Sequence, residues 1–376
     1  MTLAPYASHA AASRGRRHPE PPAPTRDDFQ RDRDRIVHST AFRRLVYKTQ
    51  VFLNHEGDLF RTRMTHSLEV AQLGRSVSRS LGLNEDLVEA IALAHDLGHT
   101  PFGHAGQDTL NACMAGHGGF EHNLQSLRVV DRLEHRYPQY DGLNLSFETR
   151  EGILKHCSRA NAERIDAAEP GGVARRFIEN TQPSLEAQLC NLADEIAYNA
   201  HDIDDGVRSG LIGIDQLKEV ELFERFRHEA VAEYPQLAGR RLLYETIRRM
   251  LSHQVYDVID ATRAALDEAM PSDAEAVRRC QRLVQFSPAM RAQSTELKRF
   301  LFANLYRHAR VVQTTTQAQQ VVRELFAAYL AQPGEMPPDY ARQQDTPRAV
   351  ADYIAGMTDR FAMREHERLT GRTWTV

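Results

Sequence analysis

Cysteine is scarce in this 376-residue chain, which has four of them, far apart in the sequence and without a Cys-x-x-Cys pair. This usage excludes a disulfide framework and fits a reducing compartment, with the thiols as small core residues. Two kinds of apolar segment are also missing: a run long enough to span a bilayer, and a signal segment at the N-terminus. We therefore expect a soluble, cytoplasmic protein with no membrane partner.

An excess of basic residues is missing as well. The formal net charge of −4 argues against nucleic acid as an obligate partner, although a local basic pocket for a small polyanion is compatible with it. Alternating strand patterns and hairpin turn pairs are scarce, and residues 142–149 are the one candidate for a short extended piece.

Helical periodicity, by contrast, runs through most of the chain. Between residues 185 and 207 the apolar positions are spaced by three and four, as on one face of a helix. Thr65, Asn84 and the pair Thr346-Pro347 are start signals for further helices. The pattern predicts an all-α protein.

Three regions follow from composition. Residues 1–28 are rich in Ala, Pro, Arg and His and predict a flexible N-terminal arm. Residues 29–210 carry the strongest helical pattern and the chemically distinctive motifs, and residues 211–376 continue as a helical C-terminal region. The length allows two or three domains or one continuous helical body.

The segment from His95 to His104, with the sequence HDLGHTPFGH, is the most distinctive motif. Its ten positions hold three histidines, an aspartate, two glycines and a proline, a combination that packing or turn formation seldom requires. The adjacent His95 and Asp96 offer a neutral imidazole and a carboxylate, a ligand set suited to a hydrolytic divalent ion. The motif indicates a metal site that acts on a phosphate.

Partners for that pair stand on two other predicted helices. His66 lies on the helix that starts near Thr65, and Asp194, Tyr198 and Asp202 recur every four residues along the long helix. A solvated helix face would also explain the recurrence. As a ligand set, however, His66, His95, Asp96 and Asp194 would give a mixed nitrogen and oxygen site for Mg, Mn, Fe, Co or Zn.

Longer strings resemble one known family. They are RDRDR (31–35), AFRRL (41–45), KTQV (48–51), RTRMTHSLE (61–69), the 95–104 motif, GFEHN (119–123), ETREG (148–152) and ADEIAY (193–198). Together they resemble the deoxyguanosinetriphosphate triphosphohydrolase-like proteins of the HD-domain metal phosphohydrolase superfamily. The resemblance extends from about residue 31 to 205 and resumes at 296–301 and 349–360. A bare HD dipeptide would be weak evidence, since His201-Asp202 is a second copy in this chain.

The resemblance implies an HD-domain helical fold whose C-terminal region completes the pocket and makes oligomer contacts. It implies hydrolysis of deoxynucleoside triphosphates, dGTP and others, to the deoxynucleoside and inorganic triphosphate. Water then attacks the α-phosphorus and the 5′-oxygen leaves. Because an alkoxide is a poor leaving group, the reaction needs a proton donor in addition to a divalent ion.

Site residues are carried over from the family motifs one by one. His104 matches the proton donor, and Arg63, His99 and His122 match groups that bind the phosphates, with His122 also in the catalytic group. Tyr198 matches the aromatic residue that packs on the deoxyribose. Asp202, Gln50 and the adjacent Val51 match groups at the 3′-hydroxyl. Lys155 and His156 are further candidates for binding phosphate, although residues of this kind are more often on the surface.

One position departs from the family pattern. Relatives commonly carry an acid three residues after the histidine that matches His104, where this chain has Gln107. A glutamine can accept a hydrogen bond from an imidazole but cannot stabilise an imidazolium as a carboxylate does. We therefore expect slower proton transfer than in those relatives, and a higher turnover in a Gln107→Glu variant.

Two other functions stay open at this point. One is an HD phosphohydrolase that acts on nucleoside monophosphates or another phosphoester, and the other is a nucleotide-binding regulatory protein with little activity. The resemblance also implies a homo-oligomer and, in some members, nucleotide effectors. The arginine-rich stretch 31–44 and Lys298-Arg299 are candidates for effector sites or, equally, solvated helix faces.

Overall fold

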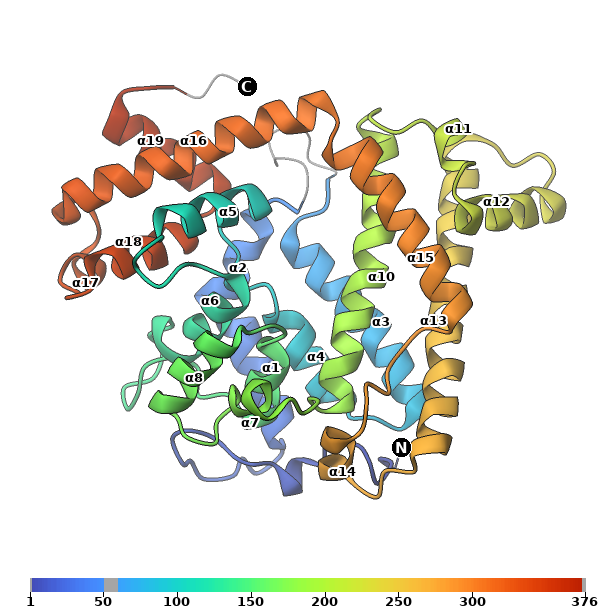
Figure 1. Ribbon diagram of the computed structural model, residues 1–376, viewed down its shortest axis with the longest axis horizontal. Helices are drawn as coiled ribbons and strands as arrows, with labels where there is room; N and C mark the ends of the chain where they lie inside the picture. Colours follow the sequence, from blue (N-terminus) through green and yellow to red (C-terminus); the bar gives the residue numbers. More distant parts are fainter. Residues whose placement is uncertain (1, 51–59, 374–376) are drawn as a thin grey trace.

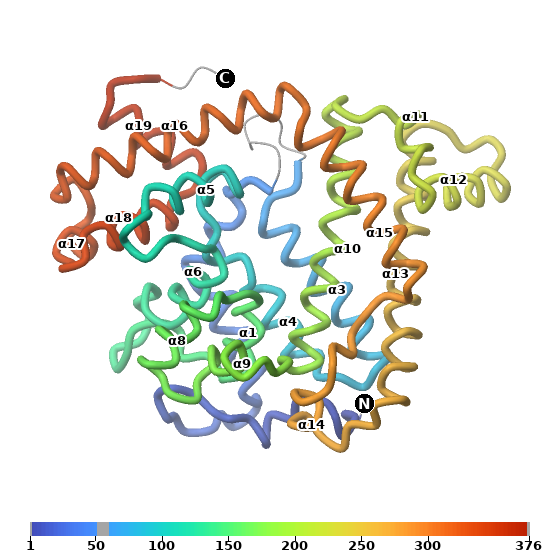
Figure 2. Tube along the Cα trace, viewed as in Figure 1, coloured from blue at the N-terminus to red at the C-terminus, as the bar shows by residue number. Residues whose placement is uncertain are grey.

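The computed structural model describes residues 2–50 and 60–373 of the chain. In these two ranges the regular structure is helical and no β-strand forms, which confirms the predicted all-α class (Figure 1). None of the described helices combines the length and apolar character needed to cross a membrane. Figure 2 shows α14 (Ala274–Arg279) and α19 (Asp359–Thr370) on opposite sides of the molecule.

The first half of the chain forms the centre of the molecule. Its helices are α1 Asp28–His38, α2 Thr40–Arg44, α3 Arg63–Leu81, α4 Glu85–Ala94, α5 Gly103–Cys113, α6 His122–Arg128, α7 Phe147–Ile153, α8 Arg159–Ala168, α9 Arg175–Glu179 and α10 Leu185–Arg208. Helices α3, α4 and α10 pack against one another, and α1 and α7 lie against α4. Figure 1 shows α3 and α10 side by side in the middle of the view.

Local sequence signals explain where these helices begin and end. Thr62 caps α3 in a reciprocal pair with Thr65, so the helix starts slightly before the predicted Thr65. Gly82, at φ 67°, ends it in a left-handed conformation that favours glycine. Asn84 caps α4 as predicted, and its side chain accepts a hydrogen bond from Leu87 N.

Other predicted boundaries are close to the observed ones. The long apolar period matches α10, whose N-cap is Ser184. The extended piece predicted for residues 142–149 is shorter, because Ser146 caps α7 and the chain is helical from there. Thr346-Pro347 does begin a helix, with Asp345 as its cap.

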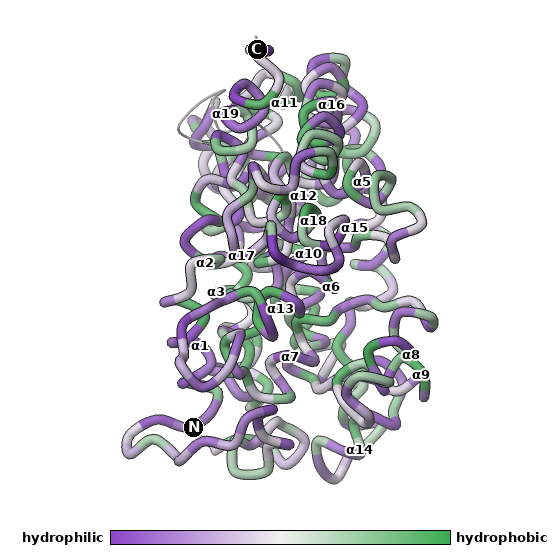
Figure 3. Tube along the Cα trace, turned by 90° about the vertical axis from the view of Figure 1, so that its left-hand side faces the viewer, coloured by the Kyte–Doolittle hydropathy of each residue, from purple (hydrophilic) through white to green (hydrophobic). Residues whose placement is uncertain are grey.

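The second half contributes the remaining helices. They are α11 Ile214–Leu217, α12 Glu221–Glu233, α13 Gly239–Ala269, α14 Ala274–Arg279, α15 Pro288–Leu301, α16 Ala309–Ala331, α17 Pro338–Ala341, α18 Thr346–Ala355 and α19 Asp359–Thr370. A π-helical turn, Phe302–Tyr306, follows α15. In Figure 3 hydrophobic and hydrophilic positions alternate along these helices, as expected of amphipathic elements.

Two hydrophobic clusters hold the molecule together. The larger joins α1, α3, α4, α7 and α10 with α12, α13 and α15. The smaller gathers α16, α18 and α19 around α5. The residues beyond 210 therefore pack on two separate sides of the helices that carry the HD motif, rather than forming one appended layer.

The N-terminal segment was predicted to be flexible, but its described residues are hydrogen-bonded to the helices. Ser8 Oγ donates to Glu186 on α10 at 2.8 Å, and Ser13 Oγ donates to Glu148 on α7 at 2.6 Å. Both carboxylates are buried and each gains a donor from the segment, so the segment is tied to the helices despite its proline content.

A joint between the two halves lies beside the HD motif. Asp359, at the start of α19, accepts hydrogen bonds from the backbone nitrogens of Thr49 and Phe102, both at 2.9 Å. The buried Lys48 donates to the carbonyl oxygens of Ala355, at 2.7 Å, and His99. Burial lowers the pKa of Lys48 to about 7, because a charged amine loses hydration there.

Candidate functional site

Three helices bring the predicted metal ligands together. His66 comes from α3, His95 and Asp96 follow the last turn of α4, and Asp194 comes from α10. His66, His95 and Asp96 are buried, and their candidate ligand atoms all lie within 4.8 Å of one another. Asp194 Oδ1 lies 2.9 Å from His66 Nε2 and 3.7 Å from His95 Nε2, so it belongs to the same cluster.

The donor set fits a divalent ion. His95 Nδ1 lies 2.6 Å from the carbonyl oxygen of Ala92 and must donate to it, which leaves the Nε2 lone pair free. That Nε2 atom is buried and has no hydrogen-bond partner among the described residues, yet it faces Asp96 Oδ1 at 3.2 Å. A nitrogen lone pair that faces carboxylate oxygens is unfavourable unless a cation lies between them. A divalent ion would bind all of these atoms at once.

Two cations compensate the carboxylates. Arg63 Nη1 lies 2.8 Å from Asp96 Oδ2, and Lys155 Nζ lies 2.6 Å from Asp194 Oδ2. Burial alone would raise the pKa of both acids, but the neighbouring basic side chains outweigh it, His95 and Arg63 for Asp96 and Lys155 and His95 for Asp194. Both pKa values therefore lie far below the usual range, and both groups are ionised at neutral pH.

A second group of three histidines lies next to the cluster. The rings of His99 and His122 stack with centroids 4.1 Å apart, and the ring of His104 lies edge-on to His99 at 5.7 Å. Burial, followed by the charge of Arg63, lowers the pKa of His99 and His104. Burial also lowers the pKa of His122, to about 3. All three imidazoles are neutral at pH 7 when no substrate is present.

Gln107 supports a different histidine from the one predicted. Its Oε1 accepts hydrogen bonds from the backbone nitrogen of His122, at 3.2 Å, and from His122 Nδ1. The expectation that Gln107 would orient His104 is therefore wrong. His104 stands in the first turn of α5, whereas α6 begins with His122 opposite the next turn of α5, within reach of the glutamine side chain.

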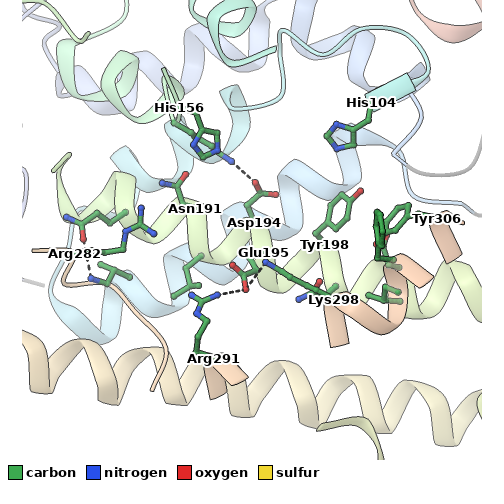
Figure 4. A pocket seen from close by; sticks show the side chains of 18 residues that line it. His104, His156, Asn191, Asp194, Glu195, Tyr198, Arg282, Arg291, Lys298 and Tyr306 are labelled. Carbon is green, nitrogen blue, oxygen red and sulfur yellow. Dashed lines mark hydrogen bonds and ion pairs between the residues drawn. The ribbon is translucent and has the colours of Figure 1, made fainter. Parts of the chain in front are cut away.

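A cavity of about 540 Å³ opens beside these residues. His104, Asp194, Tyr198 and Asp202 line it together with Lys155 and His156, as Figure 4 shows for most of them. The expected line of polar residues on α10 thus faces a cavity and is not simply a solvated helix face.

Sequence reasoning missed the far wall of this cavity. Tyr306, in the π-helical turn after α15, donates a hydrogen bond to Asp202 and stacks near Tyr198, with centroids 6.5 Å apart. Burial raises the pKa of Asp202 well above its usual value. Arg291 and Lys298 of α15 also line the cavity and pair with Glu195. Tyr306 lies far from Tyr198 and Asp202 in the sequence, so no local sequence pattern predicts that these side chains meet.

Two other predicted substrate-binding residues, Arg63 and Gln50, are not among the described residues that line the cavity. Arg63 is buried under the histidines, and the tip of its side chain approaches Gly103. Gln50 is buried near the same glycine, and its Oε1 has no hydrogen-bond partner in the part of the chain that the structure describes. Val51 lies outside the described residues.

Known proteins share these features. Residues 63–199 match the HD domain family, and residues 284–368 match the phosphohydrolase-associated domain. A deoxyguanosinetriphosphate triphosphohydrolase-like protein of Bordetella pertussis (strain Tohama I / ATCC BAA-589 / NCTC 13251) is 62% identical over 373 residues, which covers 98% of this chain and 96% of that protein.

Proteins of the same name occur in other bacteria. One from Ralstonia nicotianae (strain ATCC BAA-1114 / GMI1000) is 62% identical, with 98% of this chain and 94% of that protein covered. One from Nitrosomonas europaea (strain ATCC 19718 / CIP 103999 / KCTC 2705 / NBRC 14298) is 56% identical, with 98% and 97% covered. The chain therefore belongs to the deoxyguanosinetriphosphate triphosphohydrolase-like family of HD-domain phosphohydrolases.

Proposed function

We propose that this chain hydrolyses deoxynucleoside triphosphates to the deoxynucleoside and inorganic triphosphate with the help of a divalent ion. The observation that carries the proposal is one cavity lined by Asp194 of the metal cluster, by His104 and by the aromatic side chains of Tyr198 and Tyr306. Its volume of about 540 Å³ lies within the range of small-molecule sites, and its lining combines apolar surface with convergent polar groups.

His66, His95, Asp96 and Asp194 would hold the divalent ion, which supplies Lewis acidity and lowers the pKa of a water molecule. The ligand types are compatible with Mg, Mn, Fe or Co. Arg63, His99 and His122 bind the triphosphate through charge and hydrogen bonds. Tyr198 packs on the deoxyribose, and Asp202 accepts a hydrogen bond from the 3′-hydroxyl, with Gln50 and Val51 nearby.

His104 gives the proton that the leaving 5′-oxygen needs. Water attacks the α-phosphorus and its oxygen stays on the triphosphate, while the bond from phosphorus to the 5′-oxygen breaks. The alkoxide takes the proton from the His104 imidazolium, and the proton that the water loses passes to solvent. Because burial and Arg63 lower the pKa of His104, the free protein holds it neutral. The negative charge of a bound triphosphate favours the protonated form of His104, so that substrate binding converts His104 into the proton donor.

Product analysis tests this proposal. Each deoxynucleoside triphosphate, alone and in mixtures, is incubated with the protein and Mg or Mn, and inorganic triphosphate is the expected product. A His95→Ala variant should lose turnover, whereas His135→Ala, an exposed histidine, should keep it. Orthophosphate from a monophosphate would instead favour a phosphomonoesterase. Nucleotide binding without turnover would favour a regulatory protein, and either result would contradict the proposal.

Family membership also supports a homo-oligomer and nucleotide effectors for this chain. Sedimentation of the protein with and without added nucleotides, followed by turnover measurements in nucleotide mixtures, tests both. A monomer with the same turnover under all mixtures would contradict them.

A further inference from the structure

The second HD dipeptide of the chain, His201-Asp202, has one member that the proposed mechanism does not use. His201 lies on α10, seven residues after the candidate ligand Asp194, and therefore two turns further along nearly the same face. Its side chain is 2% exposed. It does not line the substrate cavity but points toward α3, where His66 lies.

His201 connects a metal-ligand candidate to a carboxylate. Its Nδ1 lies 3.4 Å from His66 Nδ1, and its Nε2 is hydrogen-bonded to the side chain of Glu69. Glu69 stands on α3 three residues after His66 and is 43% exposed, while Arg61 lies 3.8 Å from its other oxygen. The three side chains thus form a line from the metal cluster to the surface.

The protons along this line are fixed by elimination. His66 can offer its Nε2 lone pair to a cation only if its proton sits on Nδ1. That proton must then be donated to His201 Nδ1, which is an acceptor only if the His201 proton sits on Nε2. Glu69, as a carboxylate, accepts that last proton. With a cation on His66 Nε2 every donor in the line meets an acceptor, and reversing one bond would leave two hydrogens or two lone pairs facing each other. Without the cation, the His66 Nε2 lone pair would itself face Asp194 Oδ1 at 2.9 Å.

We infer that Glu69 and His201 form a positioning relay that fixes the ring orientation and tautomer of His66 for a divalent ion. The inference rests on the metal site of the proposed function. A carboxylate at the end of the line also makes the His66 Nε2 lone pair more basic, as outer hydrogen bonds do for metal-bound imidazoles. His95 achieves the same end differently, through the backbone carbonyl of Ala92.

A bland alternative is that His201 is merely a core histidine satisfied by Glu69. The chain offers a matched control for this case, because His366 on α19 is equally buried and its Nε2 bonds Glu324 on α16 at 2.7 Å. That pair lies in the smaller hydrophobic cluster region, away from the metal-ligand candidates. Loss of packing alone would have the same effect at both pairs.

The experiment measures Mn²⁺ affinity directly, from the electron paramagnetic resonance signal of free Mn²⁺ during titration of the protein. His201→Phe removes the acceptor and should weaken binding roughly 10- to 100-fold. His201→Asn, whose amide oxygen occupies the place of Nδ1, should restore part of the loss. Glu69→Gln keeps an acceptor without the charge and should weaken binding less than His201→Phe. His366→Phe and Glu324→Gln should bind Mn²⁺ as the unaltered protein does.

The outcomes separate the relay from the site it serves. If the unaltered protein binds Mn²⁺, His95→Ala abolishes binding, and His201→Phe and Glu69→Gln bind normally, the relay is refuted while the metal site stands. If the unaltered protein binds no Mn²⁺, the metal site and the relay fall together. Should His201→Phe fail to fold, Glu69→Gln and His201→Asn decide, since the Glu69 side chain is partly exposed and its substitution removes no buried packing.

Discussion

Replacing Gln107 by glutamate should act on His122 and not on His104. In the present structure Gln107 Oε1 accepts from His122 Nδ1, and burial keeps the pKa of His122 at about 3. A carboxylate in the place of the amide would accept the same hydrogen bond and also stabilise the imidazolium form. The pKa of His122 should therefore rise, while that of His104 should stay nearly unchanged.

The size of the effect follows from the contact. A hydrogen bond to a charged partner contributes about 1.5–3 kcal/mol, and one pKa unit corresponds to about 1.4 kcal/mol, so the rise is about 1–2 units. The His122 pKa then reaches roughly 4–5. At pH 5.5 the protonated fraction grows from below about 1% to as much as a quarter, whereas at pH 8 it stays negligible.

Nuclear magnetic resonance of the histidine ring protons, titrated against pH in the substrate-free Gln107→Glu protein, measures both pKa values. Turnover should rise at pH 5.5 and stay unchanged at pH 8, since His122 binds phosphate better as a cation. Gln107→Met, which removes the acceptor, should lower the pKa further. A shift in His104 instead of His122, or no shift in either, would refute the assignment of Gln107 to His122.

Three further changes test other parts of the structure. Gly98→Ala would bring a Cβ within 2.1 Å of a backbone nitrogen of α6 and should lower the free energy of unfolding by about 3 kcal/mol in urea titrations, whereas Gly334→Ala, in open space among the described residues, should be neutral. Tyr306→Phe removes the hydroxyl that bonds Asp202 and should raise the KM for nucleotide about five- to tenfold with a smaller change in kcat; an unchanged KM would separate this wall from the substrate. Because burial lowers the pKa of His122 to about 3, its imidazole takes up a proton below pH 6.5 in the unfolded protein but not in the folded one, so this residue should contribute a fall of about 1.4 kcal/mol per pH unit in the free energy of unfolding from pH 6.5 toward 3, in addition to the contributions of the other buried histidines. His122→Gln should flatten this slope in metal-free protein, and an equally steep slope in the variant would contradict the assignment.

The sequence predicted the local features well. The cap at Asn84 and the long helix from Leu185 follow from signals within a few residues, namely side-chain capping and periodicity. Such signals act through the backbone close by, so a single sequence contains them. The grouping of His66 with His95 was predicted from their ligand types and from the order of the family motifs.

The missed features all depend on residues far apart in the chain. Tyr306 meets Asp202 across 104 positions, and Lys155 meets Asp194 across 39. Which helix face turns toward which neighbour is decided by packing in the two clusters, and no local pattern encodes that choice. The wrong partner for Gln107 has the same origin, because the family pattern suggested His104 while the approach of α6 brought His122 within hydrogen-bond distance.

The joint at Asp359 has a consequence for how the protein can be cut or fused. One carboxylate ties the backbone at Thr49 and at Phe102, immediately before the helix that carries His104. A fragment that ends near residue 210 would keep all four metal-ligand candidates yet lose the carboxylate that these two amides share. The HD region is thus not a transferable module, because Ala355 of α18 and Asp359 of α19 belong to the scaffold of the candidate site.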